Sequence, residues 1–425
     1  MVCISLIATI VFTSTSVFAA NNITSNSVNA SVKQNEFAVF VSNDGLYMSE
    51  LKENNPILLD KNDKIELPII SRDGLYVAYT KNNSLYICNI KTHEIAEVAK
   101  NVESYDWNSS GNMIYSTKDV GMLMYNTNTK NSTSLINNEY NYYNIKCDSK
   151  NKMYANKRIE YTKDNKQYSK SIGIISYDFD NKEEKDILKS KEGNNKEVGE
   201  QFKISDLLES LGSTPNVSKI SSDDRYLYIW NKPHSGSMSA DMTEFAVYDI
   251  LNNKFIENNN MIALANKDNI SQNPVDSKMI TVNNGEGREP YYNKTLRIFN
   301  VEDNTFINLL PEDQVSMMPD YSEDGKNIVY SGTNNLNDKK LKNFKEWFNQ
   351  PHYIYQVNVD TKNVTQITNG KFCDFSPKYL LNNEILFERY DGNSCSLWKV
   401  KDGVETKLAE VVSPDTWYEM DVFIG

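Results

Sequence analysis

Histidine is scarce in this chain of 425 residues, and its three copies limit the metal and catalytic chemistry that can be expected. His93 falls in a turn between two expected strands, whereas His234 and His352 fall in long connections. A metal site normally needs three or four converging ligands, and neither connection adds a paired acidic motif. We therefore expect no metal ion and no other cofactor.

Two short segments resemble catalytic or ion-binding sequences only superficially. Ser235-Gly236-Ser237 contains serine but not the G-x-S-x-G elbow that activates a serine nucleophile. Asp178-Phe179-Asp180-Asn181 offers carboxylates for calcium but lacks the other ligands of a calcium loop, and its composition suits a turn. The sequence thus indicates no catalytic residue and favours a non-catalytic protein over an enzyme.

Aromatic residues in the long connections are better candidates for ligand binding. Tyr291 and Tyr292 follow a flexible Gly-Glu-Gly segment, which favours stacking on a ligand. Trp347 belongs to an apolar stripe of helical spacing that either binds a partner or packs on its own blade. The candidate ligand-binding residues are His234, Tyr291, Tyr292, Trp347 and His352. We expect the three aromatic residues to contribute to binding more than to stability.

The segments around these residues repeat along the chain. The clearest unit runs from Met318 to Thr368, with a tight turn at Asp324-Gly325 followed by three extended apolar segments. Close copies begin at Ser71 and Asn108, and looser copies begin near Cys147, Ser221, Asn273 and Ser376. An eighth copy from Gly45 has no recognisable first strand. In most copies the third strand ends in Asn or Asp, as a following turn requires.

A mean repeat of about 48 residues, with short strands and regular turns, is typical of propeller blades. We predict an all-β protein with a single closed β-propeller of four-stranded blades, eight in number, with seven as the alternative. Helical spacing predicts two short inserted helices, within 338–350 and 196–212. The segment Thr416–Ile424 is expected to supply the strand that the first blade lacks, and so to close the ring.

The repeat carries a family resemblance. Its pattern of Ser-x-Asp-Gly, an apolar strand, a strand ending in Asn or Asp, and a strand ending in Thr resembles the TolB-type β-propeller repeat. Related blades occur in the propellers of dipeptidyl and prolyl oligopeptidases. This resemblance implies a fold rather than a function, because such propellers serve many purposes.

Propeller connectivity places the long connections on one face. Three insertions join second to third strands at residues 231–243, 283–294 and 332–351, and the link 196–212 joins two blades. The Asp-Gly turns, which join first to second strands, lie on the opposite face. Because loops of this kind usually carry function, we expect the binding site on the first of these faces.

The ends and the composition indicate the compartment and the partners. Residues 1–19 resemble a signal peptide, 20–35 a flexible leader, and 36–425 form the propeller. The net charge of −12 disfavours nucleic acid, anionic lipid and anionic polysaccharide as main partners. The four cysteines after residue 19 show no metal-site spacing and are expected to be small buried apolar residues.

The sequence therefore predicts a secreted, extracytoplasmic binding or scaffold protein, monomeric and without stable membrane insertion. Its partner is expected to be a protein, peptide or glycan at the cell envelope, recognised through the loop-rich face. The alternative is a propeller enzyme, a polysaccharide lyase or glycosidase acting on carbohydrate. That alternative requires carboxylates to converge with His234 or His352.

Overall fold

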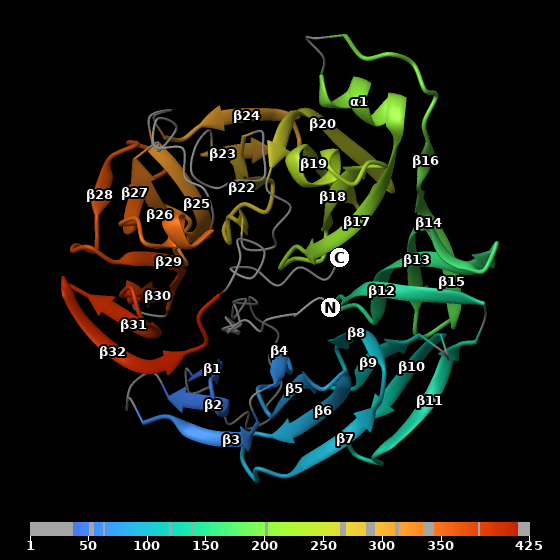
Figure 1. The fold of residues 1–425 in the computed structure, drawn as a ribbon, viewed down its shortest axis with the longest axis horizontal. Helices are drawn as coiled ribbons and strands as arrows, with labels where there is room; N and C mark the ends of the chain where they lie inside the picture. The colour runs from blue at the N-terminus through green and yellow to red at the C-terminus, as the bar shows by residue number, and fades with distance from the viewer. Residues whose placement is uncertain are drawn as a thin grey trace, which may run out of the picture.

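Eight antiparallel sheets stand around a central axis as the blades of a β-propeller (Figure 1). The computed structural model describes residues 37–50, 55–62, 64–118, 121–137, 139–199, 203–263, 269–285, 294–310, 314–334, 344–380 and 383–414. The predicted all-β fold is confirmed, with eight blades rather than seven. The expected signal peptide and leader lie outside the described residues.

Each blade is an up-and-down meander that runs outward from the axis, and blade 5 also has a short extra strand, Lys191–Glu192, before its innermost strand (Figure 1). Blades 1 to 4 contain β1 (Phe37–Ser42), β2 (Gly45–Glu50), β3 (Ile57–Lys61); β4 (Ile65–Ile70), β5 (Tyr76–Lys81), β6 (Ser84–Asn89), β7 (Ile95–Ala99); β8 (Val102–Trp107), β9 (Met113–Thr117), β10 (Gly121–Asn126), β11 (Asn131–Ile136); and β12 (Tyr140–Cys147), β13 (Lys152–Lys163), β14 (Lys166–Asp178), β15 (Glu183–Lys189).

Blades 5 to 8 contain β16 (Lys191–Glu192), β17 (Gly212–Ile220), β18 (Tyr226–Pro233), β19 (Thr243–Asp249), β20 (Lys254–Ala263); β21 (Ile270–Gln272), β22 (Met279–Asn284), β23 (Thr295–Asn300), β24 (Thr305–Asn308); β25 (Gln314–Tyr321), β26 (Asn327–Asn334), β27 (Tyr353–Asn358), β28 (Val364–Gln366); and β29 (Cys373–Tyr379), β30 (Ile385–Tyr390), β31 (Cys395–Lys401), β32 (Val404–Val411). The helices are α1 (Ile204–Leu211), α2 (Met238–Asp241) and α3 (Phe344–Phe348). Both predicted helices are present, and α2 adds a single turn that the sequence did not suggest.

Ring closure is visible where blade 8 meets blade 1. Within the described residues, blade 1 has three strands, and β1 takes the place of a second strand. The backbone N–H of Val412, just after β32, donates to the carbonyl oxygen of Val41 at 3.3 Å. This bond lies on the edge of β1 that faces away from β2, where an innermost strand would begin. The predicted closing segment, Thr416–Ile424, lies outside the described residues.

The Ser-x-Asp-Gly signature folds the turn between first and second strands in blades 2 and 7. In blade 2, Ser71 Oγ donates to Asp73 Oδ1 at 2.6 Å and accepts the N–H of Tyr76 at 2.9 Å. Gly74 adopts a φ of 70°, which glycine accepts without the steric cost of a Cβ atom. Blade 7 has the same bonds, with Ser322 Oγ 2.7 Å from Asp324 Oδ1. The most conspicuous repeat in the sequence is therefore a structural turn.

The Asn or Asp at the end of a third strand also makes a turn, as predicted. Asn89 Oδ1 accepts the N–H groups of Lys91 and Thr92 at 3.0 and 2.9 Å. Asp178 accepts two backbone N–H groups in the same way, at 3.0 and 3.1 Å, so its carboxylate serves a turn. These hydrogen bonds, with burial opposing them, lower the pKa of Asp178.

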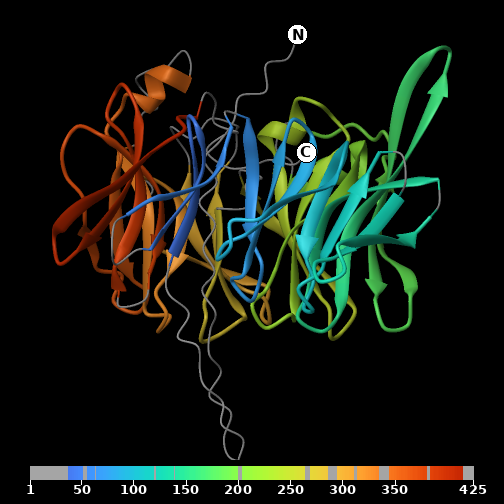
Figure 2. The same ribbon diagram turned by 90° about the horizontal axis from the view of Figure 1, so that it is seen from below.

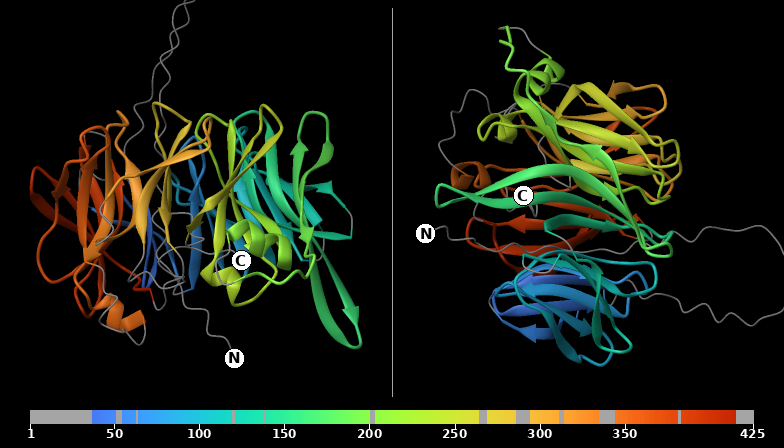
Figure 3. Two further views of the ribbon diagram at one scale, coloured as in Figure 1. Left: turned by 90° about the horizontal axis from the view of Figure 1, so that it is seen from above. Right: turned by 90° about the vertical axis from the view of Figure 1, so that its right-hand side faces the viewer.

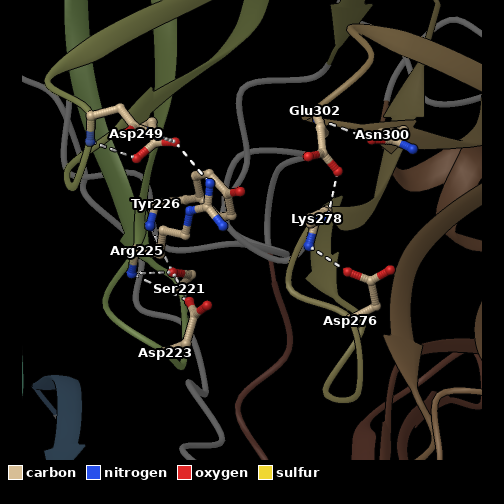
Figure 4. A network of polar contacts seen from close by, with 10 residues as sticks. Ser221, Asp223, Arg225, Tyr226, Asp249, Asp276, Lys278, Asn300 and Glu302 are labelled. Atoms are coloured by element: carbon tan, nitrogen blue, oxygen red, sulfur yellow. Dashed lines mark hydrogen bonds and ion pairs between the residues drawn. The ribbon is translucent and has the colours of Figure 1, made fainter.

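Charged residues beside these turns are tied together in pairs. Figure 4 shows the arrangement in blades 5 and 6, where Arg225 lies 3.2 Å from Asp249 and Lys278 pairs with Glu302. The guanidinium of Arg225 also lies over the ring of Tyr226, 4.9 Å from its centroid. Exposed pairs of this kind contribute little stability.

The apolar core lies between neighbouring blades. Blades 5 and 6, for example, share a cluster that contains Tyr228, Trp230, Phe245 and Phe299. The cysteines at positions 88, 147, 373 and 395 are all buried and unpaired, which confirms that they behave as small apolar residues. Among the described residues, no helix is long and apolar enough to cross a membrane.

Candidate functional site

Whereas most of the insertion at 283–294 lies outside the described residues, the connections that contain α1, α2 and α3 emerge on one face, as predicted. We call this the insertion face, and the face that carries the Ser-x-Asp-Gly turns the turn face. Figure 2 shows α3 and the hairpin of β13 and β14 projecting on the same side of the ring, and Figure 3 shows the same side from other directions. The link that contains α1 and the insertion that contains α2 occupy blade 5 on this face. Two of the predicted ligand-binding residues, Tyr291 and Tyr292, lie outside the described residues.

The most prominent feature of the insertion face is one that the sequence analysis missed. The β13–β14 hairpin continues past the last pair that joins β12 to β13, Tyr140 and Ile159. We call residues 160–169 the arm. Its strand β13 extends four residues beyond that pair, to Lys163, or roughly 13 Å. Every residue of the arm is exposed.

Local chemistry explains why the arm is folded. Asp164 and Asn165 form its tip with φ values of 51° and 59°, which these two residue types tolerate in a two-residue hairpin turn. Tyr161 and Tyr168 are directly opposite each other, and their rings stack with centroids 5.6 Å apart. Such cross-strand aromatic pairs stabilise a hairpin. The polar run with an Asp-Asn dipeptide was the sequence signal that could have revealed it.

The base of the arm is fixed by ion pairs. Arg158 pairs with Glu103 of blade 3 and lies 2.9 Å from Glu160. Lys157 lies 2.6 Å from Glu184 on β15 and over the ring of Tyr140. The side chains of Arg158 and Lys157 are only 16% and 12% exposed, so these contacts restrict the direction in which the arm points.

The α3 region packs the fold. Trp347 is completely buried, and its ring lies 4.4 Å from that of His352. Phe348 stacks on Tyr390 of blade 8 at 4.2 Å and contacts Phe375 edge-on. The apolar stripe therefore packs on blades 7 and 8, which is the alternative to partner binding that the sequence left open. Trp347 presents no surface to a ligand in this structure.

His352 is likewise internal, at the junction of blades 7 and 8. Its backbone forms a bridge with Cys373, and its Nδ1–H donates to the carbonyl oxygen of Gln350 at 2.9 Å. Its Nε2 atom is buried without a hydrogen-bond partner. Burial lowers the pKa of His352 to about 4, although the Gln350 contact opposes this.

This neutral histidine predicts acid sensitivity. As pH falls from 6.5 to about 4, the unfolded chain gains a proton that the folded His352 does not, so the free energy of unfolding falls. The loss approaches about 3 kcal/mol at pH 4. We expect His352→Gln to flatten this part of a stability–pH profile measured by urea unfolding. His93→Asn, in an exposed turn, is the control and should keep the wild-type slope.

The profile of His352→Gln is needed because a second buried group, Glu244, changes the free energy of unfolding in the opposite direction as the pH falls. Glu244 is fully buried, accepts a hydrogen bond from Asn231 at 2.9 Å, and has its pKa raised to about 7 by burial. Its contribution is present below pH 4.5 and is lost as pH rises to about 7. A His352→Gln profile that still falls steeply between pH 6.5 and 4 would contradict the assignment to His352.

His234 lies apart from the other candidates. It is exposed on blade 5, where its Nε2 atom is 2.9 Å from Thr214 Oγ1 and its backbone N–H donates to Gly212. His352 lies between blades 7 and 8, so the structure does not bring the two histidines together. Within the described part of the chain, no three His, Cys, Asp or Glu side chains are grouped as metal ligands.

α1 covers blade 5 rather than presenting an open groove. Ile204, Leu207 and Leu208 are buried and pack with Met238 and Met242 from the neighbouring insertion. The apolar residues of the helix predicted within 196–212 are therefore used for packing. Among the described residues of the insertion face, the arm is thus both exposed and fixed, and His234 lies in the next blade.

The fold is that of an eight-bladed β-propeller, a fold shared with solved structures of other proteins. A candidate dipeptidyl aminopeptidase IV from Bacteroides ovatus aligns with a TM-score of 0.51 and 9% identity, over 90% of this chain and 59% of that one. This chain thus spans little more than half of that protein. The similarity supports the propeller fold alone.

Two further structures align less closely. Oligogalacturonate lyase from Vibrio parahaemolyticus has a TM-score of 0.48 and 11% identity, over 86% of this chain and 96% of that one. A candidate TolB from Agrobacterium tumefaciens has a TM-score of 0.39 and 14% identity, over 77% and 89%. No protein-family model and no curated protein matches the sequence.

Proposed function

We propose that this protein is an exported recognition protein that binds a protein, peptide or glycan at the cell envelope through its insertion face. The observation that carries the proposal is the arm, an exposed ribbon that leaves the blade and is fixed at its base by ion pairs. A binding element that is already ordered loses little conformational entropy when it meets a partner.

The arm also has the side chains of a contact surface. Tyr161 and Tyr168 are 43% and 42% exposed, and tyrosine offers a large contact area with few rotatable bonds. Binding energy in interfaces is concentrated in such aromatic residues. Lys163 and Lys166 flank the tip, and lysine on a free strand edge discourages pairing with another copy of the same edge. The arm is thus suited to contact by side chains and protected from self-association.

The test compares envelope binding by matched surface variants. We expect Tyr161→Ser/Tyr168→Ser to reduce the binding of purified protein to envelope preparations of the source organism by about tenfold or more, equivalent to ~1.4 kcal/mol. The melting temperature should change little, because a cross-strand pair contributes only about 0.2–1 kcal/mol.

The control removes comparable apolar surface from the turn face. Leu251→Ser/Val275→Ser alters two turn residues that are 77% and 71% exposed. This variant should bind as the wild type does. Equal binding by the tyrosine variant, or an equal loss in both variants, would show that the arm is not the contact surface.

A further inference from the structure

A cavity of about 310 Å³ opens on the turn face, away from the arm. Its walls come from four consecutive blades, blades 2 to 5, at the ends of their innermost strands and the turns that follow. The charged groups that line it are Arg72, Asp106, Lys146, Lys219 and Asp224. A cavity of this size lies at the lower end of the range for small-molecule sites.

The two carboxylates of the cavity are already used to join blades. Asp106 on β8 accepts the backbone N–H of Cys147 on β12 at 2.8 Å, and its other oxygen accepts the N–H of Trp107 at 2.9 Å. Both oxygens of Asp224 in blade 5 accept hydrogen bonds from Ser149 in blade 4, one of them from the backbone N–H at 3.1 Å. These acids are therefore oriented toward the backbone of blade 4.

Three positively charged side chains line the same cavity. Arg72 donates Nη2–H to the carbonyl oxygen of Cys147 at 2.6 Å, and its guanidinium has further N–H groups. Lys219 donates to the carbonyl oxygen of Ile270 in blade 6 at 3.2 Å, which ties its ammonium group to the neighbouring blade. Lys146 brings a third positive charge from β12. Three cations thus surround one small volume that contains two engaged carboxylates.

We propose that this cavity binds a small molecule that carries an oxyanion, a carboxylate or a phosphate monoester, between Arg72, Lys146 and Lys219. Arginine provides a planar pair of N–H donors that matches either group, and lysine provides point charges that complete its neutralisation. The net charge of −12 belongs to the whole chain and does not prevent a local cationic pocket, because exposed charges more than about 10 Å away are largely screened.

The ring of innermost strands supplies a matched control. In each of these blades one residue begins the turn after the innermost strand, and the position two residues before it can be compared between blades. This position is occupied by Asp106, Lys146 and Lys219 in blades 3 to 5, and by Asp320 and Lys378 in blades 7 and 8. Asp320 accepts the N–H of Tyr379 at 2.8 Å, as Asp106 accepts that of Cys147. Lys378 does not line the cavity. Lys378→Met therefore removes the same charge from an equivalent position outside the pocket.

The experiment is calorimetric titration of the purified protein with sodium phosphate, glucose 6-phosphate and sodium succinate, against sodium chloride of equal ionic strength. We expect at least one of the three oxyanions to bind, Lys146→Met to weaken that binding by about tenfold or more, and Lys378→Met to leave it unchanged. Binding of succinate alone would identify a carboxylate ligand, and binding of the phosphates alone a phosphate ligand.

Two results would overturn the proposal. One is the absence of binding by all three oxyanions to the wild-type protein. The other is an equal loss in Lys146→Met and Lys378→Met, which would indicate non-specific attraction to the ring of charges. Unfolding midpoints of both variants, measured without ligand, separate a loss of binding from a loss of structure.

Discussion

Replacing Arg389 with methionine is expected to lower the free energy of unfolding by about 3–5 kcal/mol, because it leaves a buried carboxylate without its partner. Arg389 on β30 contacts both oxygens of Asp374 on β29, at 2.6 and 2.8 Å, and Glu405 on β32 at 2.6 Å. The Asp374 side chain is 1% exposed. Urea unfolding of the wild type and variant at neutral pH measures the change.

Aromatic rings enclose the same guanidinium. The Arg389 Cζ atom lies 4.6, 5.2 and 4.9 Å from the ring centroids of Phe372, Phe387 and Trp398. Burial raises the pKa of Asp374 even though Arg389 opposes it, so loss of the cation favours the protonated acid further. The double variant Arg389→Met/Asp374→Leu removes both charges and should recover most of the lost stability.

Lys278→Met provides the exposed comparison. Its pair with Glu302 joins side chains that are 37% and 62% exposed, and we expect its loss to change the free energy of unfolding little. A cost for Arg389→Met no greater than that for Lys278→Met would show that the buried pair does not hold blade 8 together.

The features predicted correctly from the sequence are those that local chemistry determines. Ser71, Asp73 and Gly74 form their turn through contacts among neighbouring residues, so the same letters give the same turn in blade 7. The Asn and Asp residues at the ends of third strands act in the same way. The repeat period then follows, and with it the number of blades.

The features that escaped prediction depend on contacts between blades. The cavity on the turn face exists because the ring places Arg72, Lys146 and Lys219 side by side, although they are up to 147 positions apart in the chain. The fully buried Glu244 in blade 5 has no sequence signature, because an isolated Glu is usually exposed. The arm was missed for another reason. Its polar residues resemble a loop, and only the Tyr161–Tyr168 pairing identifies a ribbon.

Trp347 tests whether the α3 region is core or contact surface, and Trp347→Ala is expected to lower the free energy of unfolding by about 3–5 kcal/mol. The side chain is completely buried in a cluster that includes Phe40 of blade 1, Met317 of blade 7 and Leu397 of blade 8. Removing it leaves a cavity where three blades meet, and the thermal unfolding midpoint should fall by several degrees.

Two variants make this result specific. Trp347→Phe keeps an aromatic ring and should lose less than half as much stability as Trp347→Ala, because much of the buried apolar volume remains. Lys345→Ala, on the exposed side of the same short helix, should leave the midpoint unchanged and so control for helix propensity. If Trp347→Ala instead lost envelope binding at an unchanged midpoint, α3 would belong to the contact surface and the core assignment would be wrong.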